Sequence, residues 1–204
     1  MPRTRYEILT LAAVALACQK APPSAETTAA THAALVKRGE RLVQLGGCSD
    51  CHTPVAFDPK LKMPVPERER FLSGHPTNAP GPTVKPGPTD TAVIGPTFTS
   101  FAAPFGVVYA RNLTPDPETG LGSWSEADFI KTMQTGHQKG TGRPLLPPMP
   151  WQNLSTQPVE ELRAIYAYLK SIKPVKNQVP DPAVPAPVIA AIGATFPKPE
   201  KGIN

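Results

Sequence analysis

The sequence contains little cysteine, and its few cysteines are unevenly placed. Only three of the 204 residues are cysteine: Cys48 and Cys51 form a close pair, and Cys18 lies far upstream in an apolar stretch. A structural zinc site needs a second pair of ligands at comparable spacing, which Cys18 alone does not supply. A redox-active dithiol normally follows a β-strand, a context that this pair lacks. Neither a zinc site nor a redox-active dithiol therefore explains the pair Cys48 and Cys51.

Long apolar runs and dense basic runs are also missing. The N-terminal apolar stretch, residues 8–17, has about ten residues, whereas a membrane-spanning helix needs roughly 20. The net charge is +5, but the basic residues form no dense run interleaved with aromatic residues, so we expect no nucleic-acid partner. The positive charge suits an acidic protein partner or an anionic membrane surface, and equally a generic solvated surface.

The N-terminus has the pattern of an export signal. Arg3 and Arg5 precede the apolar stretch, and Ala15-Leu16-Ala17 fits the small-x-small cleavage pattern, which predicts a signal peptide over residues 1–17. Cleavage there makes Cys18 the first mature residue. This stretch resembles a bacterial lipoprotein signal, and that resemblance implies a lipid on Cys18 and attachment to a membrane. An ordinary signal peptide that leaves or removes a free cysteine is the alternative.

Proline divides the rest of the chain. There are 28 prolines, and they cluster in two places, where they exclude helix interiors. We expect a flexible tether over 18–31, one domain over 32–174 with an irregular insertion over 54–106, and a proline-rich tail over 175–204. Within the insertion only short extended pieces are compatible with the sequence, and the tail either wraps the surface or is disordered.

Three helices are expected within the domain. An amphipathic helix runs from His32 to the glycine pair 46–47, and Gly39 inside it hints at a close helix crossing. Ser125 is placed to cap a second helix, which ends near Gly136 and has Phe129, Ile130 and Met133 on its apolar side. A third helix begins after Thr156 with Pro158 in its first turn, has one apolar face and ends before Pro174.

The sequence Cys48-Ser49-Asp50-Cys51-His52 has the C-x-x-C-H spacing of covalent haem attachment. Two thiols on one short helical turn can reach both vinyl groups of a porphyrin. The adjacent imidazole can then approach the iron from the same face. We therefore expect one covalently bound haem c, held through Cys48 and Cys51, with its iron ligated by His52.

The opposite iron ligand is predicted from the proline-framed loop 140–151. Met149 stands between two prolines there, and a thioether is a soft, neutral ligand for either oxidation state of iron. A core methionine is the alternative. Met133 is better explained by helix packing, His137 remains a rival ligand, and His75 is expected to be a solvated surface residue.

Taken in chain order, these motifs resemble a class I cytochrome c, and especially the bacterial haem modules that accept electrons from membrane-associated dehydrogenases. The similarity covers about residues 33–174, without most of 54–103. It rests on Gly39, C-x-x-C-H at 48–52, Asn112-Leu113-Thr114-Pro115-Asp116, Gly122-Ser123-Trp124-Ser125, Pro148-Met149-Pro150 and Tyr168-Leu169. The resemblance implies an all-α fold around one haem.

The same resemblance implies roles for single residues. His52 would be the proximal ligand and Met149 the distal one, with Cys48 and Cys51 as thioether attachments. Gly39 would pack against Tyr168 of the last helix. Finally, Arg111 and Asn112 would lie near the haem edge. Relatives of this kind often have two or three C-x-x-C-H motifs; this chain has one, so a multihaem relay within it is not expected.

These observations predict an electron carrier rather than an enzyme. We expect single-electron transfer between a dehydrogenase and a respiratory acceptor, either an oxidase or a reductase, on the periplasmic side of a bacterial cell envelope. One alternative is an electron-transfer subunit of a larger dehydrogenase complex. Another is a haem sensor or peroxidase, which would need an open position on the iron.

Overall fold

The computed structural model describes residues 25–83 and 91–195. The expected signal peptide 1–17 and the lipidation residue Cys18 lie outside the described residues. So do the first part of the expected tether, residues 84–90 of the insertion and residues 196–204 of the tail.

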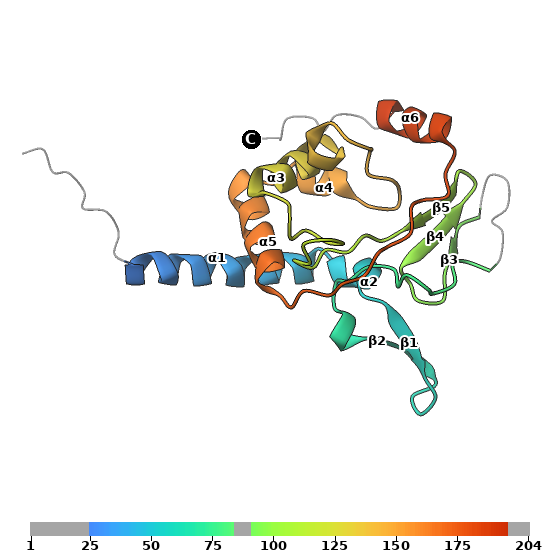
Figure 1. The fold of residues 1–204 in the computed structure, drawn as a ribbon, viewed down its shortest axis with the longest axis horizontal. Coiled ribbons are helices and arrows are strands. Elements are labelled where there is room, and N and C mark those ends of the chain that lie inside the picture. Colours follow the sequence, from blue (N-terminus) through green and yellow to red (C-terminus); the bar gives the residue numbers. More distant parts are fainter. Residues whose placement is uncertain (1–24, 84–90, 196–204) are drawn as a thin grey trace, which may run out of the picture.

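Helices form most of the body, and the helical class expected from the sequence is confirmed (Figure 1). They are α1 (Ala25–Leu45), α2 (Cys48–His52), α3 (Glu126–Thr135), α4 (Trp151–Ser155), α5 (Val159–Ser171) and α6 (Ala186–Thr195), with short 3-10 turns at Arg68–Arg70 and Gln138–Gly140. The core lies between α1, α3 and α5. Its buried apolar side chains are Val43, Leu72, Leu121, Phe129, Met133, Leu162, Ile165 and Leu169.

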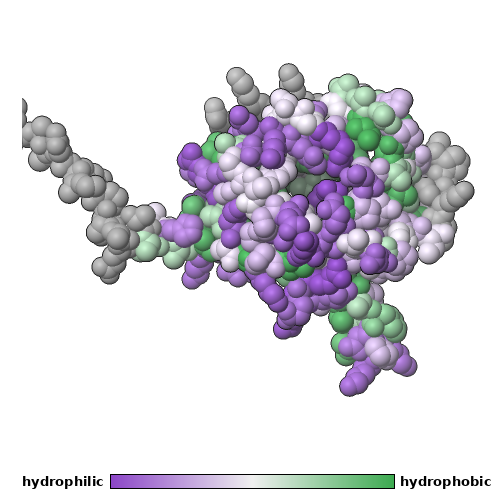
Figure 2. Space-filling model, in the orientation of Figure 1, coloured by the Kyte–Doolittle hydropathy of each residue, from purple (hydrophilic) through white to green (hydrophobic). Residues whose placement is uncertain are grey.

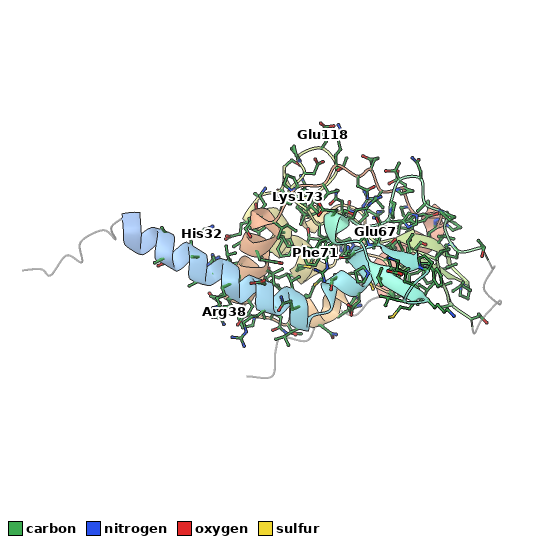
Figure 3. All side chains as sticks on the ribbon, turned by 90° about the horizontal axis from the view of Figure 1, so that it is seen from below. His32, Arg38, Glu67, Phe71, Glu118 and Lys173 are labelled. Atoms are coloured by element: carbon green, nitrogen blue, oxygen red, sulfur yellow. The ribbon has the colours of Figure 1, made fainter. Side chains whose placement is uncertain are left out.

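Helices α1 and α5 cross in close contact at Gly39, as the sequence predicts. A Cβ on Gly39 would lie 1.8 Å from the carbonyl oxygen of Ala164 and 2.8 Å from the Cβ of Tyr168, so only glycine fits. Nearby, Arg38 Nε donates to Glu161 Oε2 at 2.7 Å, which joins the two helices on their exposed side. Figure 3 shows Arg38 on α1, and Phe71 where α1 meets the rest of the molecule.

The start and end of α3 follow local sequence signals. Ser125 accepts a hydrogen bond from the Asp128 amide, and the Asp128 carboxylate accepts one from the Ser125 amide, which completes a capping box. The helix ends at Gly136, where φ is 68°. Met133 is buried in the core, which confirms its packing role.

Helix α1 begins earlier than expected. It starts at Ala25 rather than His32, so the expected tether 18–31 is already helical over its second part. Figure 1 shows this end of α1 projecting beyond the body. Alanine and threonine residues without a proline after position 23 permit the extra turns, even though they bury no large apolar side chain.

The insertion 54–106 is more regular than expected. It contains β1 (Val55–Asp58) and β2 (Met63–Pro66), an antiparallel hairpin, and most of a second antiparallel sheet. That sheet has the order β3–β4–β5, from Val93–Ile94, Ser100–Ala103 and Gly106–Tyr109. These strands are hard to detect in the sequence because each is only two to four residues long and proline is frequent around them.

The tail wraps the surface, which is one of the two alternatives expected for it. Asn177 attaches it to the insertion: its Nδ2 donates to the carbonyls of Ser73 at 2.7 Å and His75 at 2.9 Å, and its Oδ1 accepts from the Thr77 amide at 3.1 Å. Further along, Val107 and Ala183 exchange backbone hydrogen bonds. The tail then forms α6. Among the described residues, no helix is both long and apolar enough to cross a membrane.

Replacing Gly39 tests the helix crossing. We expect Gly39→Ala to lower the free energy of unfolding by about 3 kcal/mol or more, because the new methyl would overlap the backbone of α5. Gly81→Ala is the matched control, since its Cβ would meet the side chain of Tyr109 at no less than 3.4 Å. Equal midpoints in urea for the two variants would contradict the packing described here.

Replacing Asn177 tests the attachment of the tail. Asn177→Ala leaves the carbonyls of Ser73 and His75 without their side-chain donor, and we expect a loss of about 3 kcal/mol in unfolding free energy. Exposed Asn78 lies in the same region, so Asn78→Ala serves as the control and is expected to change stability by less than about 0.5 kcal/mol. Faster hydrogen exchange at residues 174–185 in Asn177→Ala, but not in Asn78→Ala, would locate the effect.

Candidate haem site

The C-x-x-C-H sequence forms its own short helix, α2, directly after α1. Gly47 separates the two helices with φ of 62°, a left-handed conformation that glycine adopts without strain. A Cβ at Gly47 would also lie only 2.9 Å from Oδ2 of Asp50. The turn therefore brings Cys48, Cys51 and His52 onto one helical turn at the end of α1, as the sequence predicts.

Both thiols are free and half-buried. Burial raises the pKa of Cys48, and burial followed by the nearby Asp50 carboxylate raises the pKa of Cys51. A catalytic dithiol needs the opposite shift, because the thiolate is the nucleophile. The electrostatics of the pair therefore agree with thiols that serve as covalent attachment points rather than as a redox couple.

His52 is buried, and only one of its ring nitrogens is engaged within the described chain. Nδ1 lies 2.7 Å from the carbonyl oxygen of Arg111, so Nδ1 carries the proton and donates. This bond leaves the lone pair of Nε2 free, which is the arrangement of a metal-ligating histidine with an oriented ring. Burial lowers the pKa of His52, which favours the neutral imidazole that ligates a metal.

Backbone contacts hold the two segments around His52 in register. Its carbonyl accepts from the Gly74 amide at 2.8 Å, and the next side chain, Thr53, accepts from the Leu72 amide at 3.0 Å. At Gly74 a Cβ would lie 2.5 Å from the Ala110 carbonyl oxygen, so the chain before Arg111 passes directly over this glycine. The Arg111 carbonyl is thereby fixed beside the imidazole.

The side chain of Arg111 reaches the tail. Its Nη1 lies 3.3 Å from the carbonyl oxygen of Pro180 and 3.8 Å from Oδ1 of Asp181. Arg143 lies nearby, in the loop before α4. Burial lowers the pKa of Arg143 most, the charge of Arg111 lowers it further, and the charge of Asp181 raises it. Two guanidinium groups and one exposed carboxylate thus share this region. Sequence reasoning missed Arg143, because no local pattern distinguishes it from a solvated arginine.

The side chain of Asn112 joins two segments in the interior by hydrogen bonds. It is buried, its Nδ2 donates to the Val175 carbonyl at 2.8 Å and to Thr119 Oγ1 at 3.1 Å, and its Oδ1 accepts from the Thr114 hydroxyl at 2.7 Å. These contacts use the whole amide to join its own loop to the start of the tail. The expected position of Asn112 at the haem edge stays a prediction.

Met149 lies half-buried in the loop between α3 and α4. Its amide donates to the Leu146 carbonyl at 3.1 Å, and the buried indole of Trp151 packs where a Cβ on Gly136 would stand, at 2.4 Å. These contacts fix the loop around the methionine. Figure 2 shows that the face of the molecule in this view is hollowed near its middle. No contact within the described chain joins Met149 to His52, so their pairing as iron ligands stays a prediction.

Of the two other histidines near the domain core, His75 differs most from expectation. The prediction of a solvated His75 is wrong: the side chain is fully buried, with Nδ1 2.9 Å from Thr99 Oγ1 and Nε2 3.2 Å from the Ala79 carbonyl. The ring of Tyr109, which is distant in sequence, packs against it at a tilt of 43° with the ring centroids 4.8 Å apart. His137 is half-buried at the end of α3, with Nδ1 2.9 Å from the Thr135 carbonyl.

Comparison with known proteins gives the context of this site. No protein-family model matches the chain. The chain is 33% identical over 148 residues to a nicotinate dehydrogenase subunit of Pseudomonas putida, and 31% identical over 156 residues to the gluconate 2-dehydrogenase cytochrome c subunit of Pantoea cypripedii. It is also 31% identical over 151 residues to the cytochrome c subunit of the quinone-dependent alcohol dehydrogenase of Gluconobacter oxydans.

These matches cover 72%, 76% and 72% of this chain but only 9%, 27% and 24% of the relatives. The chain thus corresponds to about a quarter or less of each relative. Within that stretch, the C-x-x-C-H helix and the oriented His52 are the features expected of a cytochrome c subunit. The chain is accordingly related to cytochrome c subunits of bacterial dehydrogenases, and its helical fold is that of a c-type cytochrome.

Proposed function

We propose that this chain carries one covalently bound haem c and transfers single electrons between a dehydrogenase and a respiratory acceptor. The observation that carries the proposal is the hydrogen bond from His52 Nδ1 to the Arg111 carbonyl at 2.7 Å. It orients a buried, neutral imidazole on the same helical turn as two free thiols. A C-x-x-C-H helix with this donor set fits haem c and supports no other cofactor as well.

In this proposal each residue has a separate task. Cys48 and Cys51 would hold the haem by thioether bonds, and His52 and Met149 would ligate its iron. When bound, haem supplies an iron that cycles between the ferrous and ferric states. The protein fixes the ligands, keeps water away from the buried imidazole, and places the positive charges of Arg111 and Arg143 near the start of the tail.

The partners are proposed from chemistry and from the relatives. A dehydrogenase would donate the electron, and an oxidase or a reductase would accept it. Two of the relatives are cytochrome c subunits of dehydrogenases. They are equally compatible with a second form of the same function, in which this chain is the electron-transfer subunit of a larger dehydrogenase complex. A sensor or peroxidase is less well supported, because the rigid loop around Met149 is suited to filling the iron position.

The location is proposed from the N-terminal sequence. Residues 1–17 would direct export, and Cys18 would carry the lipid that keeps the chain on the periplasmic side of a bacterial membrane. Stable attachment is expected, since several acyl chains together bury many methylene groups at about 0.8 kcal/mol each.

Removing the thioether of Met149 tests the iron ligands. We expect wild-type ferric protein to be low-spin with the weak long-wavelength band of methionine ligation, and Met149→Ala to lose that band and to gain carbon monoxide binding in the ferrous state. Met63→Ala is the matched control because Met63 is 52% exposed on the hairpin. An unchanged spectrum in Met149→Ala would assign the ligand to another residue.

Removing the sulfur of Cys18 tests the membrane attachment. We expect the wild-type chain, expressed from its full sequence in a bacterium, to enter the detergent-rich phase in a detergent phase separation. Cys18→Ala should enter the aqueous phase instead, with the same haem content. Wild-type protein in the aqueous phase, with no lipid mass on its N-terminal peptide, would refute the lipid anchor and leave the electron-transfer proposal intact.

A further inference from the structure

The β1–β2 hairpin is an exposed apolar projection. Figure 1 shows it extending away from the helical body below α2, and Figure 2 shows apolar colour on its upper part and hydrophilic colour toward its tip. Phe57 is 67% exposed, Leu61 61% and Met63 52%. Exposed apolar side chains scattered singly need no explanation, but three gathered on one projection mark an interaction site.

The hairpin receives little support from the body beyond its base. Val55 donates its amide to the Thr97 carbonyl at 3.1 Å, and Glu67 donates its amide to the Pro54 carbonyl at 2.9 Å. Past this base, the contacts within the described chain are those between its own strands and the turn. Two-stranded hairpins are marginally stable in water, so a partner that covered this hairpin would stabilise its conformation.

The edges of the hairpin are poorly suited to strand addition. In β2, Pro64 and Pro66 have no N–H to donate, which blunts that edge against pairing with another strand. On the β1 edge, the Val55 amide is already used by Thr97. These features favour contact with a partner through side chains rather than through a shared sheet.

The charge at the tip indicates what kind of surface the hairpin fits. Lys60 and Lys62 flank Leu61, and both are exposed. Neither forms an ion pair with any residue in 25–83 or 91–195. The one carboxylate nearby, that of Asp58, accepts the amides of Lys60 at 2.7 Å and Leu61 at 3.1 Å and so holds the turn. The complementary surface is an apolar depression rimmed by carboxylates.

The hairpin also lies next to the candidate haem site. Strand β1 begins three residues after His52, and Figure 1 shows α2 at the base of the hairpin. A protein that bound the hairpin would lie near the half-buried cysteines of α2, which are proposed to hold the haem. Electron-transfer complexes need only a small interface, under about 1,200 Å² in total.

We propose that the β1–β2 hairpin is the docking element for the catalytic subunit of the electron-donating dehydrogenase. Phe57 and Met63 lie on opposite faces of the hairpin, so an apolar depression on that subunit encloses both faces together with Leu61 at the turn. Lys60 and Lys62 pair with carboxylates around it. This inference rests on the proposed electron-transfer function and adds to it the surface and the side of the molecule that receive the electron.

Photocrosslinking tests the occupant. A benzophenone amino acid replaces Leu61 in the full-length haem-loaded chain, expressed in its native cells, and Ile94 in a second variant serves as the control because it is 59% exposed on the other sheet. We expect a crosslink from position 61, and not from position 94, to a polypeptide that mass spectrometry identifies as a dehydrogenase catalytic subunit. Crosslinks only to a second copy of this chain, only to lipid, or to nothing would overturn the proposal.

A kinetic measurement separates this inference from the function beneath it. Native membranes supplied with gluconate, an alcohol, fructose or nicotinate reduce the ferric haem, and the rate is compared for wild type, the double variant Phe57→Ser with Leu61→Ser, and Ile94→Ser. We expect the double variant to be reduced about tenfold more slowly, with an unchanged spectrum and normal reduction by dithionite, and Ile94→Ser to match wild type.

The outcomes of that measurement are distinct. Equal rates for the double variant and wild type would overturn the docking role and leave the electron-transfer function standing. Failure of every substrate to reduce the wild-type haem would overturn the function, and the docking role with it. Raised ionic strength should also slow the reduction of wild type, since it screens the charges of the lysines at the tip.

Discussion

The close crossing of α1 and α5 is the constraint on which the rest of the site depends. Because Gly39 has no side chain, α1 rests directly on the backbone of Ala164, and its C-terminal end is fixed relative to the core. Gly47 then turns the chain sharply into α2, so the position of the crossing sets the position of both thiols and of His52. A helix displaced by a single methyl at Gly39 would move the whole attachment site.

Segments far from α2 in the sequence complete the site. The carbonyl of Arg111 orients the imidazole of His52, while the guanidinium of the same residue holds the tail near Pro180. Asn177 then attaches the tail to the insertion through the carbonyls of Ser73 and His75. The helical core, the insertion and the tail therefore support one another, whereas the β1–β2 hairpin projects from them with exposed apolar side chains.

Local patterns predicted much of this arrangement. The glycine in α1, the capping box of α3 and the C-x-x-C-H turn each depend on residues within a few positions, which a sequence displays directly. The burial of His75 was missed because it depends on Tyr109 and Thr99, which lie 34 and 24 positions away. Short extended pieces were expected in the insertion, but the pairing of β1 with β2 was missed because the register of strands depends on their partners and the prolines of β2 suggest a loop. Arg143 was missed because only the folded structure brings it close to Arg111 and Asp181.

The central claim is that one covalently attached haem, closed on both sides of its iron, carries single electrons. A potentiometric titration of the holoprotein, followed by its visible spectrum and paired with the intact mass of the denatured chain, tests that claim most directly. The account predicts the mass of one haem retained after denaturation, a single one-electron transition, and low-spin spectra in both oxidation states. A chain that loses its haem on denaturation, or a high-spin ferrous form, would contradict it.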